Sequence, residues 1–313
     1  MTQTMIDDAS NTVTRSLTIA AAPELVHAVL TDPQQVGQWF AQRAEFPDGV
    51  APGAEGTFWW EEHGGFAVRI EANEPPHTFA FTWANTQDPI GPDNATTATF
   101  TLEPDGDGTS ITVVETGFER LGAARRRAAM EENAQGWTGG LNGLGEHVAA
   151  LSDGGTGLRP AADLDAGRIT RTVLVRAPIG IAWECLTEPE AIEAWWGHPA
   201  VFPDGMAAGS AGTFEWVGHG LMPMLIECFD APRRFDLRWG DLGDEKPGPD
   251  ASLVEFTLTA AGEAATLVTV VETGFTGSAG AERRAAIEEN VSGWTQVMNA
   301  YVAHTARAAG AAA

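Results

Sequence analysis

The sequence predicts an α+β protein of two tandem domains, each a curved antiparallel sheet wrapped around a long C-terminal helix. First, the heptapeptide TVVETGF occurs at residues 112–118 and again at 269–275. Second, shared residues align at an offset of 156, which becomes 157 after one inserted residue. Third, each copy orders short strand-like segments before one long helical pattern. The period far exceeds the roughly 20–50 residues of solenoid repeats, so the chain is a domain duplication.

The first copy opens with a strand and two short helices. Residues 13–20 alternate and are rich in β-branched side chains, which predicts a strand. Proline suits the first turn of a helix, so Pro23-Glu24 begins a helix that ends at Leu30, and Asp32-Pro33 begins another that ends near Trp39. The second copy repeats this order from Ile169, with helices at 181–186 and up to Trp195-Trp196.

Five more strands follow in the first copy. They are close together and separated by Gly, Pro, Asn and Asp, which predicts an antiparallel meander. The predicted strands cover residues 56–62, 66–73, 78–84, 95–103 and 110–117.

A long helix over residues 121–151 closes the copy. Its apolar residues recur at steps of four and three along one face: Trp137, Leu141, Leu144, Val148 and Leu151. Glycines interrupt it at 136, 139, 140, 143 and 145, each at a cost of up to about 1 kcal/mol relative to alanine. Their number predicts close backbone approach or open space beside the sheet. A sheet curved around one helix, the helix-grip arrangement, leaves a cavity between them.

The domain boundaries follow from composition. We predict one domain over 12–151, a linker over 152–168 and a second domain over 169–308. The linker is rich in Gly, Ala, Asp and Pro and lacks apolar periodicity. Its Gly154-Gly-Thr-Gly157 stretch has no strand before it, so it is not a nucleotide-binding loop.

Composition excludes several classes of function. The chain has 43 acidic and 18 basic residues, a formal charge of −25, and this field opposes nucleic-acid binding. No apolar stretch approaches the roughly 18 residues of a membrane span, and no secretory signal begins the sequence. Cys185 and Cys228 both lie in the second copy, with Val29 and Ala72 in their places in the first. We expect buried thiols and a cytoplasmic protein.

One carboxylate lies among the valines of each heptapeptide, Glu115 and Glu272. Both faces of the strand are apolar, so alternation does not decide which way the carboxylate points. Toward the cavity, it would be a desolvated acid or base with a raised pKa. Alternatively, it lies at the rim of the sheet or holds a neighbouring loop, and this structural interpretation is preferred.

Histidines and asparagines give further candidates. His63 and His219 occupy matching positions after a tryptophan; they either bind a polar ligand tip or sit in a turn, and the turn is preferred. Asn133 and Asn290 lie one helical turn before the closing tryptophan. Asn133 is expected to be a structural clamp, with Glu115 or a backbone carbonyl as its partner, or a binding group. No His or Cys pair has ligand spacing, so no metal and no cofactor is expected.

Tryptophans supply the predicted walls of both cavities. Taken singly, each is better explained as core, but together they predict a roomy aromatic pocket. They are Trp39, Trp60, Trp83 and Trp137 in the first copy and Trp195, Trp216, Trp239 and Trp294 in the second. The second copy also carries the only tyrosine, Tyr301, in place of Leu144. A more polar second cavity is expected, so the copies hold different ligands or only one stays open.

The stretch from Ala177 to Thr187 (APIGIAWECLT), followed by Glu188-Pro189 and Trp195-Trp196, resembles the opening of START-like SRPBCC domains. Among these, the chain is most similar to the family of homologues of the heat-shock-protein-90 ATPase activator, over roughly 14–151 and 169–308. Family members often carry histidine where this chain has Asn133 and Asn290, and the eukaryotic co-chaperone has a separate N-terminal domain that is not expected here. With these two departures, the resemblance does not imply direct chaperone activation. The resemblance implies that related domains bind apolar ligands or cyclise polyketides.

Three functions follow as hypotheses. The preferred one is a non-enzymatic binding protein for a small apolar or amphipathic molecule, with no nucleic-acid or membrane partner. The second is a polyketide cyclase-like or hydrolase-like enzyme on an aromatic substrate, with Glu115 or Glu272 as base. The third is a chaperone cofactor or protein-interaction module. No Ser/His/Asp or Cys/His set occupies equivalent places in both copies, which favours the first.

Overall fold

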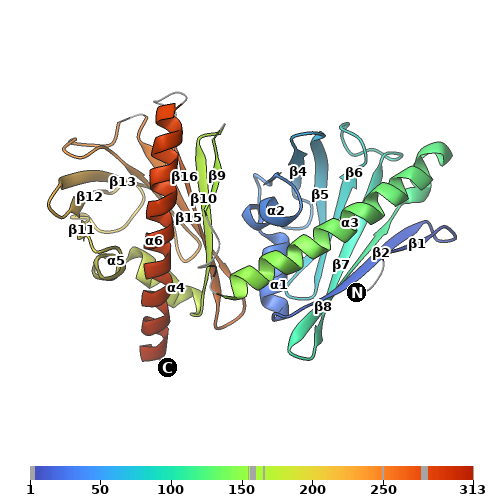
Figure 1. Ribbon diagram of the computed structural model, residues 1–313, viewed down its shortest axis with the longest axis horizontal. Coiled ribbons are helices and arrows are strands. Elements are labelled where there is room, and N and C mark those ends of the chain that lie inside the picture. Colours follow the sequence, from blue (N-terminus) through green and yellow to red (C-terminus); the bar gives the residue numbers. More distant parts are fainter. Residues whose placement is uncertain are drawn as a thin grey trace. The chain divides into compact units, whose positions relative to one another are not determined.

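The computed structural model describes residues 4–153, 155, 160–164, 166–248, 250–275 and 281–312, with the backbone alone at 281 and 282. The chain divides into two compact units, Met1–Ala149 and Ala150–Ala313. Each unit contains one antiparallel sheet of eight strands with a long helix across one face, as Figure 1 shows for α3 and for α6. This confirms the predicted α+β helix-grip fold.

The first sheet has the strand order β1-β2-β8-β7-β6-β5-β4-β3. The elements of this unit are β1 (Met5–Asp7), β2 (Thr12–Ile19), α1 (Pro23–Thr31), α2 (Pro33–Trp39), β3 (Arg43–Glu45), β4 (Glu55–Trp60), β5 (Gly64–Glu74), β6 (Thr78–Ala84), β7 (Ala95–Asp105), β8 (Gly108–Thr116), the 3-10 helix η1 (Phe118–Arg120) and α3 (Ala123–Ser152).

The second sheet has the order β11-β12-β13-β14-β15-β16-β10-β9. Its unit consists of β9 (Ala161–Asp163), β10 (Arg168–Val175), α4 (Ile179–Thr187), α5 (Pro189–Trp196), β11 (Ala200–Val201), β12 (Ala211–Trp216), β13 (Gly220–Asp230), β14 (Arg234–Trp239), β15 (Ser252–Ala260), β16 (Thr266–Thr273) and α6 (Ala281–Ala312).

One hydrogen bond between the sheet and the long helix is repeated at equivalent positions in the two units. Arg15 of β2 lies under α3, and its Nη2 donates to Asn142 Oδ1 at 3.2 Å. Arg171 of β10 lies under α6, and its Nη2 donates to Asn299 Oδ1 at 3.1 Å. The same pairing of a strand arginine with a helix asparagine therefore orients the long helix in both units.

The apolar stripe of the closing helix forms the core as predicted. All five stripe residues of α3, from Trp137 to Leu151, are 1% exposed or less. A Cβ on Gly140 would lie 3.2 Å from the ring of Phe40, and one on Gly143 would lie 3.0 Å from the Trp39 carbonyl oxygen. At Gly136 and Gly139, nothing lies within 4 Å of an added Cβ. The helix thus approaches neighbouring backbone in its middle and leaves open space toward its N-terminal half.

Short elements were not predicted. The three-residue strand β1 pairs with β2, opposing Met5 to Thr14, and β9 lies inside the predicted linker and pairs with β10. Two or three residues are too few to show alternation, and β3 and β11 were missed for the same reason. The Gly154-Gly-Thr-Gly157 stretch lies outside the described residues except at Gly155.

The thiols differ from expectation in one respect. Cys185 is buried, as predicted, but Cys228 on β13 is only half-buried, and both are free. No helix in the described part of the chain is long and apolar enough to cross a membrane. Nor do the described residues bring three or more His, Cys, Asp or Glu side chains into an arrangement that holds a metal ion.

The glycine near the start of β4 is required by packing. A Cβ on Gly56 would overlap the Glu45 carbonyl oxygen and the ring of Phe46, and Gly212 of β12 meets Phe202 in the same way. We expect Gly56→Ala to lower the free energy of unfolding by about 1–3 kcal/mol through overpacking. Chemical denaturation measures this change.

Gly136→Ala is the control, because its added Cβ contacts nothing. A helical alanine in place of glycine should raise the free energy of unfolding by up to about 1 kcal/mol. Equal denaturation midpoints for Gly56→Ala and the wild type would contradict the packing argument.

Candidate functional site

Each unit contains an aromatic cavity between its sheet and the N-terminal half of its long helix. The cavity of the first unit has a volume of about 820 Å³ and that of the second about 750 Å³. In both, the helix contributes an open glycine and a tryptophan one residue later, Gly136-Trp137 and Gly293-Trp294. The two cavities are therefore equivalent sites in a duplicated fold.

Indole and phenyl rings form the walls of the first cavity. Phe40, which follows α2, stacks on Trp137 with ring centroids 5.2 Å apart and an interplanar angle of 2°. Trp60 at the end of β4 donates from Nε1 to the Phe40 carbonyl oxygen at 3.2 Å, and Trp83 at the end of β6 lies 6.1 Å from Trp137. These contacts bring the ends of three elements together around one space.

Polar groups surround the mouth of the first cavity. The lining polar side chains are Glu62, His63, Asn85, Thr86, Gln87, Arg125, Glu132 and Asn133. His63 is exposed and sits in the β4–β5 turn, where its backbone N–H donates to the Trp60 carbonyl oxygen at 3.1 Å. The turn position predicted for His63 and a place beside the cavity are therefore compatible.

Glu115 lies behind the wall of this cavity rather than in it. It is 0% exposed and shares the helix-facing side of β8 with Ile111 and Val113. The rim position preferred from the sequence is therefore wrong for Glu115. Val114 on the other face weakened the signal, although that face also carries Ser110 and Thr112.

Four donors converge on the Glu115 carboxylate. Oε1 accepts from Trp83 Nε1 at 2.8 Å, Thr96 Oγ1 at 2.6 Å and Asn133 Nδ2 at 2.9 Å. Oε2 accepts from Trp137 Nε1 at 2.7 Å. Burial raises the pKa of Glu115 above its ordinary value, while these hydrogen bonds act in the opposite direction. Asn133 thus provides the clamp that was one of its two predicted roles.

Four indoles wall the second cavity, from the end of α5, β12, β14 and α6. Trp239 and Trp294 lie nearly parallel, with centroids 5.8 Å apart and an angle of 15°. Trp196 packs edge-on to both, at 5.9 and 5.8 Å. Trp216 also lines the cavity, and His198 stacks on it at 4.5 Å.

Glu272 lines the second cavity itself, unlike its counterpart. It is 2% exposed, and its Oε2 accepts from Trp294 Nε1 at 2.7 Å. Burial raises the pKa of Glu272 to about 7, and hydrogen bonds from Trp294, Ser252 and Trp239 oppose that shift. The Asn290 amide donates to the Ala286 carbonyl oxygen at 3.0 Å. The rim position is wrong for Glu272 too, because it faces the interior of the unit.

Most of the predicted site residues meet at these cavities. In the first unit Trp39, Trp60, His63, Trp83, Asn133 and Trp137 all line the cavity. In the second unit Trp216, Trp239, Asn290 and Trp294 do so.

Three predicted residues do not line the second cavity. Trp195 is buried, and its Nε1 donates to the Cys185 carbonyl oxygen at 2.8 Å. Tyr301 is 0% exposed, and its hydroxyl donates to the Ala182 carbonyl oxygen at 2.6 Å, so it does not make the cavity polar. His219 is exposed, and its N–H donates to the Trp216 carbonyl oxygen at 2.8 Å in a turn.

Sequence reasoning missed two groups of lining residues. Phe40 and Trp196 occupy equivalent positions and line their cavities. Each follows a tryptophan at the end of a predicted helix, and this pair of adjacent aromatic residues could have identified it. The loop between β14 and β15 contributes Asp241, Asp244 and Asp250. Its acidity was visible, but nothing in the sequence placed it over the cavity.

Comparison with known proteins identifies a family. The family model described as activator of Hsp90 ATPase homolog 1-like protein matches residues 20–149 and 176–304. A search of curated proteins finds no match.

Solved structures with small domains and with paired domains are similar to this chain. Protein MLL2253 from Mesorhizobium loti is 26% identical, over 44% of this chain and 96% of its own, with a TM-score of 0.38. DynU16, from the dynemicin biosynthetic locus, is 17% identical over 94% and 99%, with a TM-score of 0.37. The di-domain ARO/CYC BexL from the BE-7585A biosynthetic pathway is 13% identical over 95% and 98%, with a TM-score of 0.38.

The raised pKa of Glu272 predicts a pH dependence of stability. Its pKa rises from an ordinary 4.5 to about 7 in the folded unit, so the folded state keeps a proton that the unfolded chain releases at lower pH. Its stabilising contribution is complete below pH 4.5 and is lost as the pH rises to 7. Relative to Glu272→Gln, we expect the wild-type free energy of unfolding to fall by about 2–3 kcal/mol between pH 4.5 and 8.

Denaturant titrations of both proteins at several pH values measure this difference. Carboxyl NMR gives an independent readout, a titration with a midpoint near pH 7 that disappears in the variant. Stability curves that stay parallel across this pH range would show that Glu272 titrates normally.

Proposed function

This chain belongs to the activator of Hsp90 ATPase homolog 1-like family, and we propose that it binds a small apolar or amphipathic molecule in the cavity of each unit. The observation that carries this proposal is the pair of equivalent aromatic cavities, of about 820 and 750 Å³. Ligand sites typically occupy roughly 300–1,000 Å³, with mostly apolar walls and a few polar groups. Both volumes lie in that range, and both cavities combine aromatic rings with polar side chains.

The walls indicate how a ligand would be held. A flat or extended apolar body would pack against the aromatic rings that line the cavity, such as Trp60 and Trp83 in the first unit, since rings supply large contact areas at little entropic cost. A polar end would meet Asn133 at the first cavity and Glu272 at the second. Amphipathic molecules therefore suit these cavities better than purely apolar ones.

An exposed glycine on each helix leaves room at the edge of the cavity. Gly136 and Gly293 both line their cavities, and an added Cβ at either has no atom within 4 Å. Either position therefore accepts a Cβ without displacing a neighbouring atom.

One observation favours a second candidate function, confined to the second unit. Glu272 is at the cavity wall with a pKa of about 7, a value suited to a general acid or base near neutral pH. On this hypothesis the second unit converts its ligand. Incubating the ligand recovered from the protein with wild type and with Glu272→Gln, followed by mass spectrometry, should show product with the wild type alone.

Phenylalanine at the open glycines tests the binding role. We expect native mass spectrometry of gently purified protein to show bound mass of roughly a few hundred daltons per occupied cavity. Gly136→Phe should remove the ligand of the first unit only, and Gly293→Phe that of the second unit only, because each ring fills its own cavity.

The two variants serve as controls for each other, since both replace an exposed helical glycine one residue before the closing tryptophan. Denaturation midpoints of both variants close to that of the wild type would show that folding is intact. Wild-type protein of bare mass from several expression hosts, with no binding of added amphiphiles, would reject the proposal.

A further inference from the structure

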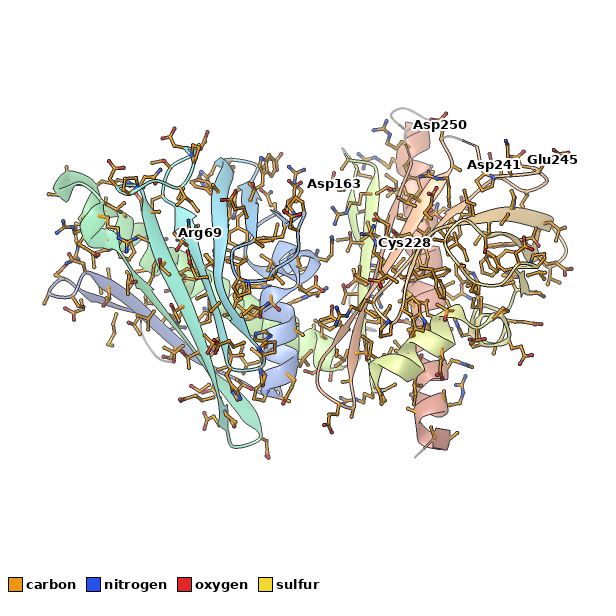
Figure 2. The ribbon with its side chains drawn as sticks, turned by 180° about the vertical axis from the view of Figure 1, so that it is seen from behind. Arg69, Asp163, Cys228, Asp241, Glu245 and Asp250 are labelled. Carbon is orange, nitrogen blue, oxygen red and sulfur yellow. The ribbon has the colours of Figure 1, made fainter. Side chains whose placement is uncertain are left out.

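The charged groups of the second cavity all have the same sign. The ionisable side chains that line it are Asp241, Asp244, Asp250 and Glu272, and none of the described lining residues is Lys, Arg or His. Figure 2 shows Asp241, Glu245 and Asp250 at the end of the unit where α6 begins. The three aspartates are exposed at the mouth, while Glu272 is 2% exposed in the wall.

The first cavity differs at two of the three corresponding positions. Its loop between β6 and β7 has Asn85 and Asn94 where the second unit has Asp241 and Asp250, and the equal pairing of Trp83 with Thr96 and of Trp239 with Ser252 fixes this correspondence. At the third position Asp88 corresponds to Asp244, but Asp88 is not among the residues that line the first cavity. Arg125 also lines the first cavity. The carboxylate of Glu115 is sealed by four donors. The first cavity therefore presents mixed charge, and the second presents only negative charge.

Carboxylates at a loop do not define a ligand site by themselves, but here they surround a cavity walled by four indoles. The face of an indole carries negative partial charge and attracts cations, Trp being the strongest such partner among side chains. Trp239 and Trp294 stack on each other, Trp196 packs edge-on to both, and all three line the cavity. Rings that attract a cation and a buried carboxylate that neutralises it therefore occupy the same wall.

We propose, on the premise that the cavities bind ligands, that the second unit takes an amphipathic molecule bearing an ammonium group. The ammonium lies against the indoles of Trp239 and Trp294 beside Glu272, and the apolar tail occupies the rest of the cavity. Asp241, Asp244 and Asp250 attract the cation toward the mouth, since a cleft lined by one sign of charge raises the local concentration of the opposite ion. The first unit lacks this preference for cations.

Calorimetry with three probes of equal tail length tests the proposal: octyltrimethylammonium, octanol and octanoate, each below its micellar range. For the second unit, measured in Gly136→Phe, we expect octyltrimethylammonium to bind at least about tenfold more tightly than octanol, and octanoate more weakly than either. Glu272→Gln, added to Gly136→Phe, should abolish most of this advantage.

A second variant keeps the test independent of the folding of Glu272→Gln. The triple substitution Asp241→Asn, Asp244→Asn and Asp250→Asn changes only exposed side chains, and should slow association of the ammonium probe, more at low salt than at high salt, because surface charges are screened. In Gly293→Phe, where only the first cavity is open, octyltrimethylammonium and octanol should bind alike.

The outcomes separate this inference from the binding role itself. Equal affinity of the second unit for the ammonium and for octanol, or tighter binding of octanoate, would overturn the cation preference and leave the binding role standing. Binding of none of the three probes by either unit would overturn the binding role, and the preference with it.

Discussion

A carboxylate inside a protein is tolerated only when donors surround it, and this constraint organises both units. Glu115 on β8 accepts hydrogen bonds from β6, β7 and α3, through Trp83, Thr96, Asn133 and Trp137. A buried donor or acceptor without a partner costs about 1–3 kcal/mol, so these elements cannot shift relative to one another independently. The hydrogen bonds to Glu115 therefore fix the height of α3 over the sheet. The helix is held by long indole donors rather than by direct packing there, and a cavity remains beside them.

The second unit keeps the scaffold and changes the exposure of the carboxylate. Glu272 retains the bond from Trp294 Nε1 at the same length as its counterpart, 2.7 Å. The amide of Asn290, however, donates to its own helix at Ala286, and the carboxylate forms part of the cavity wall. A small rearrangement of partners thus converts a sealed structural charge into a group that a ligand can contact. Duplication permits this, because the first unit retains the closed version.

The long helices and strands could be predicted from the periodicity of the sequence. The directions of single side chains that depend on tertiary contacts could not. The stripe from Trp137 to Leu151 is a strong 3.6-residue pattern, and it is the buried face of α3. The direction of Glu115 was not predicted, because Val114 places an apolar residue on the opposite face of β8, although Ile111 and Val113 share the face of Glu115. Trp195 was predicted at the cavity and Trp196 lies there instead. Which of two adjacent residues faces inward depends on where α5 ends, and sequences define helix ends only to within one or two residues. The acidic loop lies far in sequence from Glu272, and only the fold brings them to one space.

The bare helix surface at Gly136 and Gly293 makes cavity depth adjustable one side chain at a time. No atom lies within 4 Å of an added Cβ at either position, so alanine, valine or leucine there would project into empty space without displacing the core. On the proposed binding role, a larger residue at this one position would shorten the ligand that a unit accommodates. The sheet, the rest of the helix and the buried carboxylate would stay as they are.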